Sequence, residues 1–180
     1  IYTMAGPEIA VASTKAYTTQ VVVMNLLGMY FADLKGILDK DVEKELKESL
    51  LSLPEKIEAV LEMKSQVAEV SKILAEETDL FYLGRGADYA LVIEGALKVK
   101  EISYVHSEAY AGGELKHGTL ALIEEGVPVI ALATQEDVYD KMISNIREVK
   151  AREAVVIGIG MKGDEELTKH VDHTIYVPRA

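Results

Sequence analysis

The chain contains 180 residues, of which 49% are hydrophobic and 27% charged, a balance that is typical of a folded globular protein rather than a disordered one. It contains no cysteine, which excludes disulfides, cysteine metal ligands and cysteine nucleophiles. Its formal net charge of −11 argues against a nucleic-acid partner, because proteins that bind nucleic acids normally present a basic surface.

The N-terminal part of the chain is predicted to be mainly helical. Residues 1–7 predict the end of a strand and a turn, and apolar residues at helical spacing then predict a long, largely covered helix from Glu8 to Leu34, ended by Gly36. Its apolar run, residues 21–32, is shorter than the ~20 residues that a bilayer requires. With no signal peptide at residue 1, we expect a cytoplasmic protein without a membrane partner.

Two charged amphipathic helices are predicted next. The first covers residues 39–53, with acidic residues near its N-terminus that suit the helix dipole. The second runs from Pro54 to about residue 77, because proline is well tolerated in the first turn of a helix. The change from an apolar helix to charged helices predicts a domain boundary within residues 35–55.

Beyond Thr78 the pattern becomes an alternation of apolar strands and helices. Strands connected by single helices imply right-handed crossovers, so the predicted fold is α/β, an open parallel sheet with helices on both faces. The chain stops after the last predicted strand, so we expect a closing helix to be missing. The predicted strands are 79–84, 127–133, 154–160 and 173–177, and the predicted helices are 87–104 and 136–151.

One helix face carries the residues that most resemble catalytic machinery. Glu94, Lys98 and Glu101 are spaced four and three residues apart, which places them on the same side of the helix. They can be two ordinary ion pairs, each worth ~0.2–0.5 kcal/mol. Alternatively, the apolar neighbours bury this helix, and a carboxylate beside a lysine then serves as a general base. The pattern alone leaves both interpretations open.

Two glycine-rich turns are further candidates. Gly84-Arg85-Gly86 follows the first predicted strand and is either an anion-binding turn or only a tight turn. His117 lies between glycines in a predicted loop, where a histidine suits proton transfer, although the pattern alone favours an exposed loop histidine without a catalytic role. No metal-binding motif is present, so we predict neither a metal nor a cofactor.

Residues 94–118, EGALKVKEISYVHSEAYAGGELKHG, together with residues 6–20 and 119–132, resemble the isomerase half of the glutamine–fructose-6-phosphate aminotransferases, the glucosamine-6-phosphate synthases. That half consists of two sugar isomerase (SIS) domains. The resemblance implies that residues 1–38 end a first SIS domain and that residues 39–180 form most of a second.

The resemblance also implies roles for single residues. Glu101 matches the glutamate that moves a proton between C1 and C2 of the open-chain sugar, and Lys98 matches the lysine beside it. His117 matches the histidine that opens the sugar ring and that reaches the site from the other subunit of a homodimer. The implied substrate contacts are Val11, Ala12 and Ser13.

The resemblance implies an enzyme that converts fructose 6-phosphate and glutamine to glucosamine 6-phosphate, with a glutaminase domain elsewhere in the parent protein. The glutaminase domain, the phosphate-binding loop of the first SIS domain and the tail with the Schiff-base lysine lie outside the sequence, and Thr119 replaces a usual proline. We therefore expect the isolated chain to be inactive. The alternatives are a stand-alone deglycase or isomerase for amino-sugar phosphates, and a non-catalytic SIS module that senses a sugar phosphate.

Overall fold

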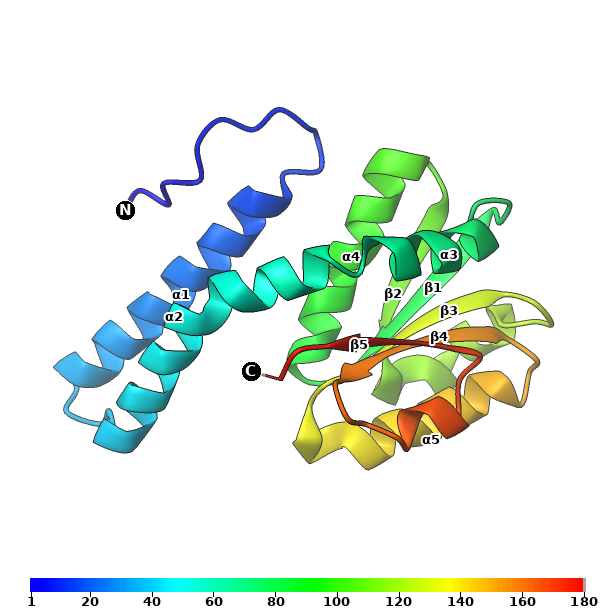
Figure 1. Cartoon of the computed structure of the whole chain (residues 1–180). Helices are drawn as coiled ribbons and strands as arrows, with labels where there is room; N and C mark the ends of the chain where they lie inside the picture. The colour runs from blue at the N-terminus through cyan, green and yellow to red at the C-terminus, as the bar shows by residue number, and fades with distance from the viewer. Residues whose placement is uncertain (180) are drawn as a thin grey trace. The chain divides into compact units, whose positions relative to one another are not determined.

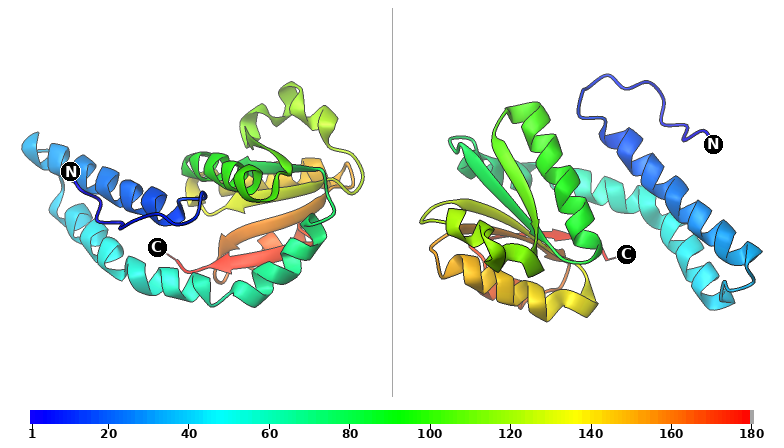
Figure 2. Two further views of the ribbon diagram at one scale, coloured as in Figure 1. Left: turned by 90° about the horizontal axis from the view of Figure 1, so that it is seen from above. Right: turned by 180° about the vertical axis from the view of Figure 1, so that it is seen from behind.

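The computed structural model describes residues 1–179, which form two compact units, residues 1–59 and residues 60–179. The first unit consists of an irregular N-terminal segment, helix α1 (Thr14–Leu34) and most of helix α2 (Lys40–Leu61). These two helices lie side by side and run in opposite directions (Figures 1 and 2). No helix in the described part of the chain is both long and apolar enough to span a membrane.

Helix α1 begins later than predicted, at Thr14 rather than Glu8, and no strand forms in residues 1–7. Ser13 has a left-handed backbone (φ 51°, ψ 34°), which is incompatible with a helix running through it. The predicted end at Gly36 is confirmed: this glycine has φ 65° and its N–H donates to the carbonyl of Asp33 at 2.9 Å. The sequence predicted that α1 is covered on most sides, but no residue of α1 is buried by the described part of the chain.

Helix α2 is continuous where two helices were predicted. Its N-terminus is capped by the Asp39 carboxylate, which accepts the N–H of Asp41 at 2.9 Å. Pro54 lies inside this helix rather than at the start of the next. Its ring holds φ near the helical value and removes only one N–H donor, and the glutamates, lysines and leucines around it are strong helix formers. The next helix, α3, covers Lys64–Leu74.

The second unit contains a five-stranded parallel sheet in the order β2-β1-β3-β4-β5. Four of its strands confirm the prediction, but β2 falls where a loop was predicted. This edge strand has the sequence HSEAYA, and only Ser107 within it is buried, so it lacks the apolar run of an interior strand. The strands are β1 (Asp79–Gly84), β2 (His106–Ala111), β3 (Pro128–Ala133), β4 (Val155–Met161) and β5 (His173–Val177).

Helices cover both faces of the sheet, as predicted (Figure 2). Helices α3 and α4 (Ala87–Ser103) pack on one face, where Val92 and Ala96 join a buried cluster with the strands. Helix α5 (Tyr139–Lys150) packs on the other face through Ile146 and its neighbours. Alternate residues of each strand point into one cluster or the other. Short 3₁₀ helices complete the connections: η1 (Gly112–His117), η2 (Thr119–Leu122), η3 (Glu136–Val138) and η4 (Leu167–Lys169).

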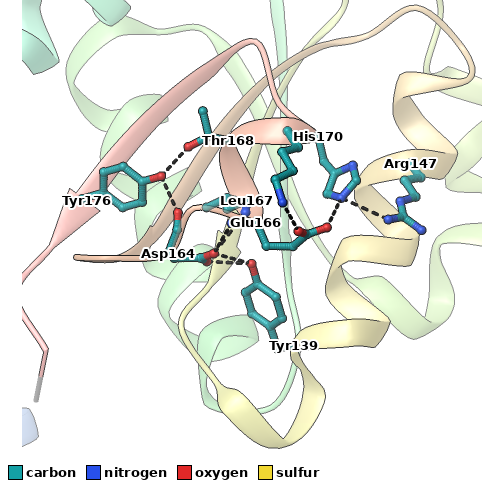
Figure 3. A network of polar contacts seen from close by, with 9 residues as sticks. Tyr139, Arg147, Asp164, Glu166, Leu167, Thr168, His170 and Tyr176 are labelled. Atoms are coloured by element: carbon teal, nitrogen blue, oxygen red, sulfur yellow. Dashed lines mark hydrogen bonds and ion pairs between the residues drawn. The ribbon is translucent and has the colours of Figure 1, made fainter.

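A polar network fixes the connection between β4 and β5 against α5 (Figure 3). The Asp164 carboxylate accepts the phenol of Tyr139 at 2.7 Å and the backbone N–H of Leu167 at 3.0 Å. The Asp164 carbonyl accepts the phenol of Tyr176 at 2.5 Å. Burial and the neighbouring carboxylate raise the pKa of Tyr139, so its phenol remains a proton donor. One aspartate therefore ties a helix, a 3₁₀ turn and the last strand together.

We expect Tyr139→Phe to lower the free energy of unfolding by about 1 kcal/mol, because it removes a partly buried hydrogen bond to a carboxylate and little apolar surface. Urea denaturation measures the change. Tyr104→Phe is the matched control, since Tyr104 is 90% exposed. Equal stability of the two variants would contradict the structural role given to the Tyr139 phenol.

The neighbouring Asp79 carboxylate raises the pKa of His106 above its ordinary value of about 6.5. Its Nδ1 lies 2.9 Å from Asp79 Oδ1, and this hydrogen bond is the main cause of the raised pKa. A raised pKa means that, while Asp79 remains ionised, the pair stabilises the fold fully below about pH 6.5, and that this contribution is lost as the pH rises through the folded-state pKa of His106. An NMR titration should give a higher midpoint in the wild type than in Asp79→Asn; equal midpoints would exclude this coupling.

Candidate active site

The C-terminal half of α4 carries a compact cluster of two carboxylates and one amine. Lys98 Nζ lies 3.2 Å from Glu94 Oε1 and 2.8 Å from Glu101 Oε2. The side chains of Glu94, Lys98 and Glu101 are 24%, 20% and 28% exposed, so each is shielded but open to a small molecule. The structure thus confirms the predicted shared face. We call these three residues the α4 cluster.

The electrostatics of the α4 cluster keep Lys98 positively charged beside the Glu101 carboxylate, which can serve as a base. The hydrogen bond to Glu101 is the main cause of a raised pKa of Lys98, so the amine keeps its proton. A protonated lysine does not act as a base, but it can orient Glu101 and donate to a bound oxygen. The Glu101 carboxylate beside it can accept and return a proton. This arrangement suits proton transfer at carbon next to a carbonyl.

Helix α4 is less buried than its sequence predicted. Only Asp88, Val92 and Ala96 are buried in it, whereas Ile93 and Ile102 are 47% and 63% exposed. The helix packs against the edge of the sheet formed by β1 and β2, so only one stripe reaches the strands. Its apolar neighbours therefore do not bury the α4 cluster on all sides.

His117 lies at the end of η1, directly after β2, and it is exposed. The loop predicted here is in fact strand β2 followed by this 3₁₀ turn. Helix α4 runs antiparallel to the strands, so Glu101, near the end of α4, lies near the N-terminal end of β2 (Figure 1). His117 instead follows the C-terminal end of β2. The six residues of β2 span about 20 Å at ~3.3 Å per residue. Within one chain the structure does not bring His117 to the α4 cluster.

The predicted substrate segment, residues 11–13, lies in the first unit at the start of α1. Val11 is 80% exposed and Ala12 is 8% exposed. The Ser13 hydroxyl donates to the Val11 carbonyl at 3.2 Å. The left-handed backbone at Ser13 is costly for a residue with a side chain, and such strain is often found at ligand-binding positions.

The turn Gly84-Arg85-Gly86 is a tight strand-to-helix connection, which agrees with one of the two interpretations of its sequence. A Cβ at Gly84 would lie 2.6 Å from the Asp88 backbone, so only glycine fits. Sequence reasoning missed Asp88, which is 1% exposed and accepts the N–H and hydroxyl of Thr134 at 2.8 and 2.5 Å. The only sequence signal was an acidic residue in the first turn of a helix. This carboxylate occupies the point between β1 and β3 where parallel sheets of this order commonly bind ligands.

The family model that matches the chain is described as the SIS domain and covers residues 73–180. This match includes all five strands, α4 and α5. The chain belongs to the SIS domain family. Its parallel sheet and the α4 cluster therefore both lie within an SIS domain.

Relatives of this SIS domain confirm the resemblance drawn from the sequence. The chain is 57% identical over 178 residues to "Glutamine--fructose-6-phosphate aminotransferase [isomerizing]" of Clostridium acetobutylicum, covering 99% of the chain and 29% of the relative. It is 47% identical over 180 residues to the protein of the same name from Methanosarcina acetivorans, again covering 29% of the relative. The chain therefore spans less than a third of the length of these relatives.

A solved structure supports the same comparison. The C-terminal domain of glucosamine-fructose-6-phosphate aminotransferase from Francisella tularensis superposes with a TM-score of 0.91 at 37% identity. The match covers 97% of this chain and 50% of that one. The comparison extends beyond the SIS match at residues 73–180, so it also includes helices of the first unit.

Proposed function

We propose that this chain is the isomerase portion of a glutamine–fructose-6-phosphate aminotransferase, which converts fructose 6-phosphate and glutamine to glucosamine 6-phosphate. The observation that carries the proposal is the α4 cluster, a shielded carboxylate 2.8 Å from a lysine, in a chain 57% identical to a relative of that name. The conversion of a 2-keto sugar to a 2-amino aldose includes a proton transfer from C1 to C2, which one positioned base can perform.

Glu101 is assigned the proton transfer between C1 and C2. Its carboxylate removes a proton from C1 of the open-chain sugar imine and returns a proton to C2, so that the enzyme ends in its starting state. Lys98 stays protonated, because its hydrogen bond to Glu101 raises its pKa, and it acts as a positioning residue and hydrogen-bond donor. Glu94 holds the other side of the lysine at 3.2 Å.

His117 is assigned the opening of the sugar ring, from the partner subunit of a homodimer. Glu101 and His117 lie near opposite ends of β2. This separation supports the assignment, because the two side chains do not meet within one chain. A two-fold dimer that places His117 of each subunit beside the α4 cluster of the other would complete two identical sites. The exposed position of His117 leaves it accessible to such a partner.

The remaining assignments concern the substrate and the domain limits. Val11, Ala12 and Ser13 are assigned contacts to the sugar phosphate, in agreement with the strained backbone at Ser13. Residues 1–38 are assigned to a first SIS domain and residues 39–180 to a second. A cytoplasmic location belongs to the same proposal, because charged sugar phosphates are confined to the compartment in which they form.

A chimeric enzyme tests the proposal. In it, this chain replaces the matched segment of the Clostridium acetobutylicum relative, and formation of glucosamine 6-phosphate from fructose 6-phosphate and glutamine is measured. We expect product formation. A chimera that folds and binds fructose 6-phosphate but forms no product would contradict the proposal and favour a sugar-phosphate sensor. Turnover of amino-sugar phosphates by the chain alone, without glutamine, would instead favour a stand-alone isomerase or deglycase.

A further inference from the structure

A separate cavity of about 230 Å³ lies between η1 and α5, where β1 and β2 end. Its walls include Arg85 from the turn after β1, Gly112 and Gly113 from η1, and Lys141 and Asn145 from α5. The α4 cluster contributes no residue to it. The cavity is smaller than the roughly 300–1,000 Å³ of pockets for drug-sized ligands, so it suits a small ion or a compact metabolite.

The charges that line this cavity are mainly positive, in a chain whose net charge is −11. Arg85, Lys116 and Lys141 face a single carboxylate, Glu148. Lys116 Nζ lies 2.9 Å from Glu148 Oε1, so that pair is largely neutralised. Lys141 forms no ion pair with any described residue, and the same holds for the terminal nitrogens of Arg85. The local excess of positive charge therefore remains available to a ligand.

The arginine is held in place before any ligand arrives. Asn145 is 4% exposed, and its Oδ1 accepts a hydrogen bond from Arg85 Nε at 2.8 Å. Asn145 Nδ2 in turn donates to Glu148 Oε2 at 3.3 Å. This chain of contacts fixes the guanidinium plane and leaves its two terminal nitrogens uncovered. Preorganisation of this kind reduces the entropy cost of binding.

The two glycines of η1 keep the guanidinium accessible. A Cβ at Gly112 would lie 2.5 Å from Asn145 Oδ1, which would displace the amide that holds the arginine. A Cβ at Gly113 would lie 3.7 Å from both terminal nitrogens of Arg85, so a longer side chain would cover them. Glycine at both positions thus preserves an open, positively charged surface.

We propose that this cavity is an anion site for a phosphate group, either inorganic phosphate or the phosphate of a small sugar ester. An arginine with two terminal nitrogens that form no described ion pair matches two phosphate oxygens, and Lys141 on α5 adds a second positive charge to the cavity. The two glycines leave room beside the guanidinium for the rest of a compact ester. The proposal rests on this cavity alone and is independent of the proposed function.

NMR titration of the ¹⁵N-labelled chain with inorganic phosphate tests the site, against sodium chloride at equal ionic strength. We expect saturable shifts of the Gly112 and Gly113 amides with phosphate only. Arg85→Gln should weaken binding about tenfold or more, through the loss of a charge-assisted bidentate contact. Lys141→Gln should weaken it several-fold without removing any described hydrogen bond. Lys162→Gln, an exposed lysine outside the cavity, should bind phosphate as the wild type does.

Shifts that rise linearly without saturation, or equal affinities in the wild type, Arg85→Gln and Lys141→Gln, would overturn the proposal. A second titration distinguishes the sources of the phosphate. Glucosamine 6-phosphate should shift the same two amides at lower concentration than inorganic phosphate if an ester is the preferred ligand, and at equal concentration if the phosphate alone is recognised. Saturable shifts with unphosphorylated glucosamine would contradict a phosphate site.

Discussion

Glu101→Gln in the chimeric enzyme is expected to lower the rate of glucosamine 6-phosphate formation by about 10²–10⁴-fold, the usual contribution of a general base. The substitution keeps the size of the side chain and a hydrogen-bond acceptor beside Lys98, which lies 2.8 Å from the carboxylate. It removes the only property that proton transfer requires, a basic oxygen. Binding of fructose 6-phosphate, measured by calorimetry, should therefore change little.

Glu94→Gln is the matched control, because Glu94 contacts the same lysine at 3.2 Å from the other side. We expect it to retain most of the activity, since Glu94 is assigned no proton transfer. Equal losses in the two variants would mean that the α4 cluster acts only through its charge balance. Loss of substrate binding together with turnover in Glu101→Gln would make Glu101 a structural residue.

His117→Ala is expected to lower kcat by about 10²-fold or more, because ring opening then lacks its general acid–base group. The side chain is exposed, so its removal should not lower the free energy of unfolding. Added imidazole should restore part of the activity, since it can enter the space that the side chain leaves. His106→Gln is the control, an exposed histidine at the other end of β2, and should retain full activity.

Unchanged activity in His117→Ala, or a loss that imidazole does not reverse and that accompanies unfolding, would remove the catalytic role of His117. A loss confined to KM would instead place this histidine among the binding residues. The ratio of kcat to KM effects therefore decides between the two roles.

Most of the second unit could be predicted from its sequence because its interior strands are continuous apolar runs. The segments around Leu80, Val129 and Val156 are covered on both faces, and such strands show no alternation with polar residues. Strand β2 failed this criterion because it lies at the sheet edge, where Glu108 and Tyr110 are only partly buried. Edge strands depend on pairing with a neighbour, which a linear pattern does not record.

The helical first unit was harder to predict at its boundaries. The start of α1 depends on the left-handed backbone at Ser13, and serine at a helix start normally predicts the opposite, an extended cap. Pro54 usually marks a helix start, but strong helix formers on both sides keep α2 continuous. At Pro54 a local preference was outweighed by the neighbouring residues, whereas the backbone at Ser13 departs from the usual preference of a serine cap.

The candidate site was only partly predictable for a geometric reason. Spacing alone placed Glu94, Lys98 and Glu101 on one face, because helical periodicity relates residues three and four apart. The relation of His117 to them depends on the direction of β2, which was not recognised as a strand. Asp88 and the cavity beside Arg85 involve partners that lie 46 and 60 residues away in the chain. No local pattern connects such residues.

Mixed dimers test the central claim, that each site combines the α4 cluster of one subunit with His117 of the other. The chimeric enzyme is prepared as Glu101→Gln, as His117→Ala, and as an equal mixture reassembled from both. Random pairing makes about half of the dimers mixed, each with one fully intact site, so the mixture should recover about a quarter of wild-type activity. If Glu101 and His117 act from the same chain, no intact site forms, and a mixture as inactive as either variant would contradict the account.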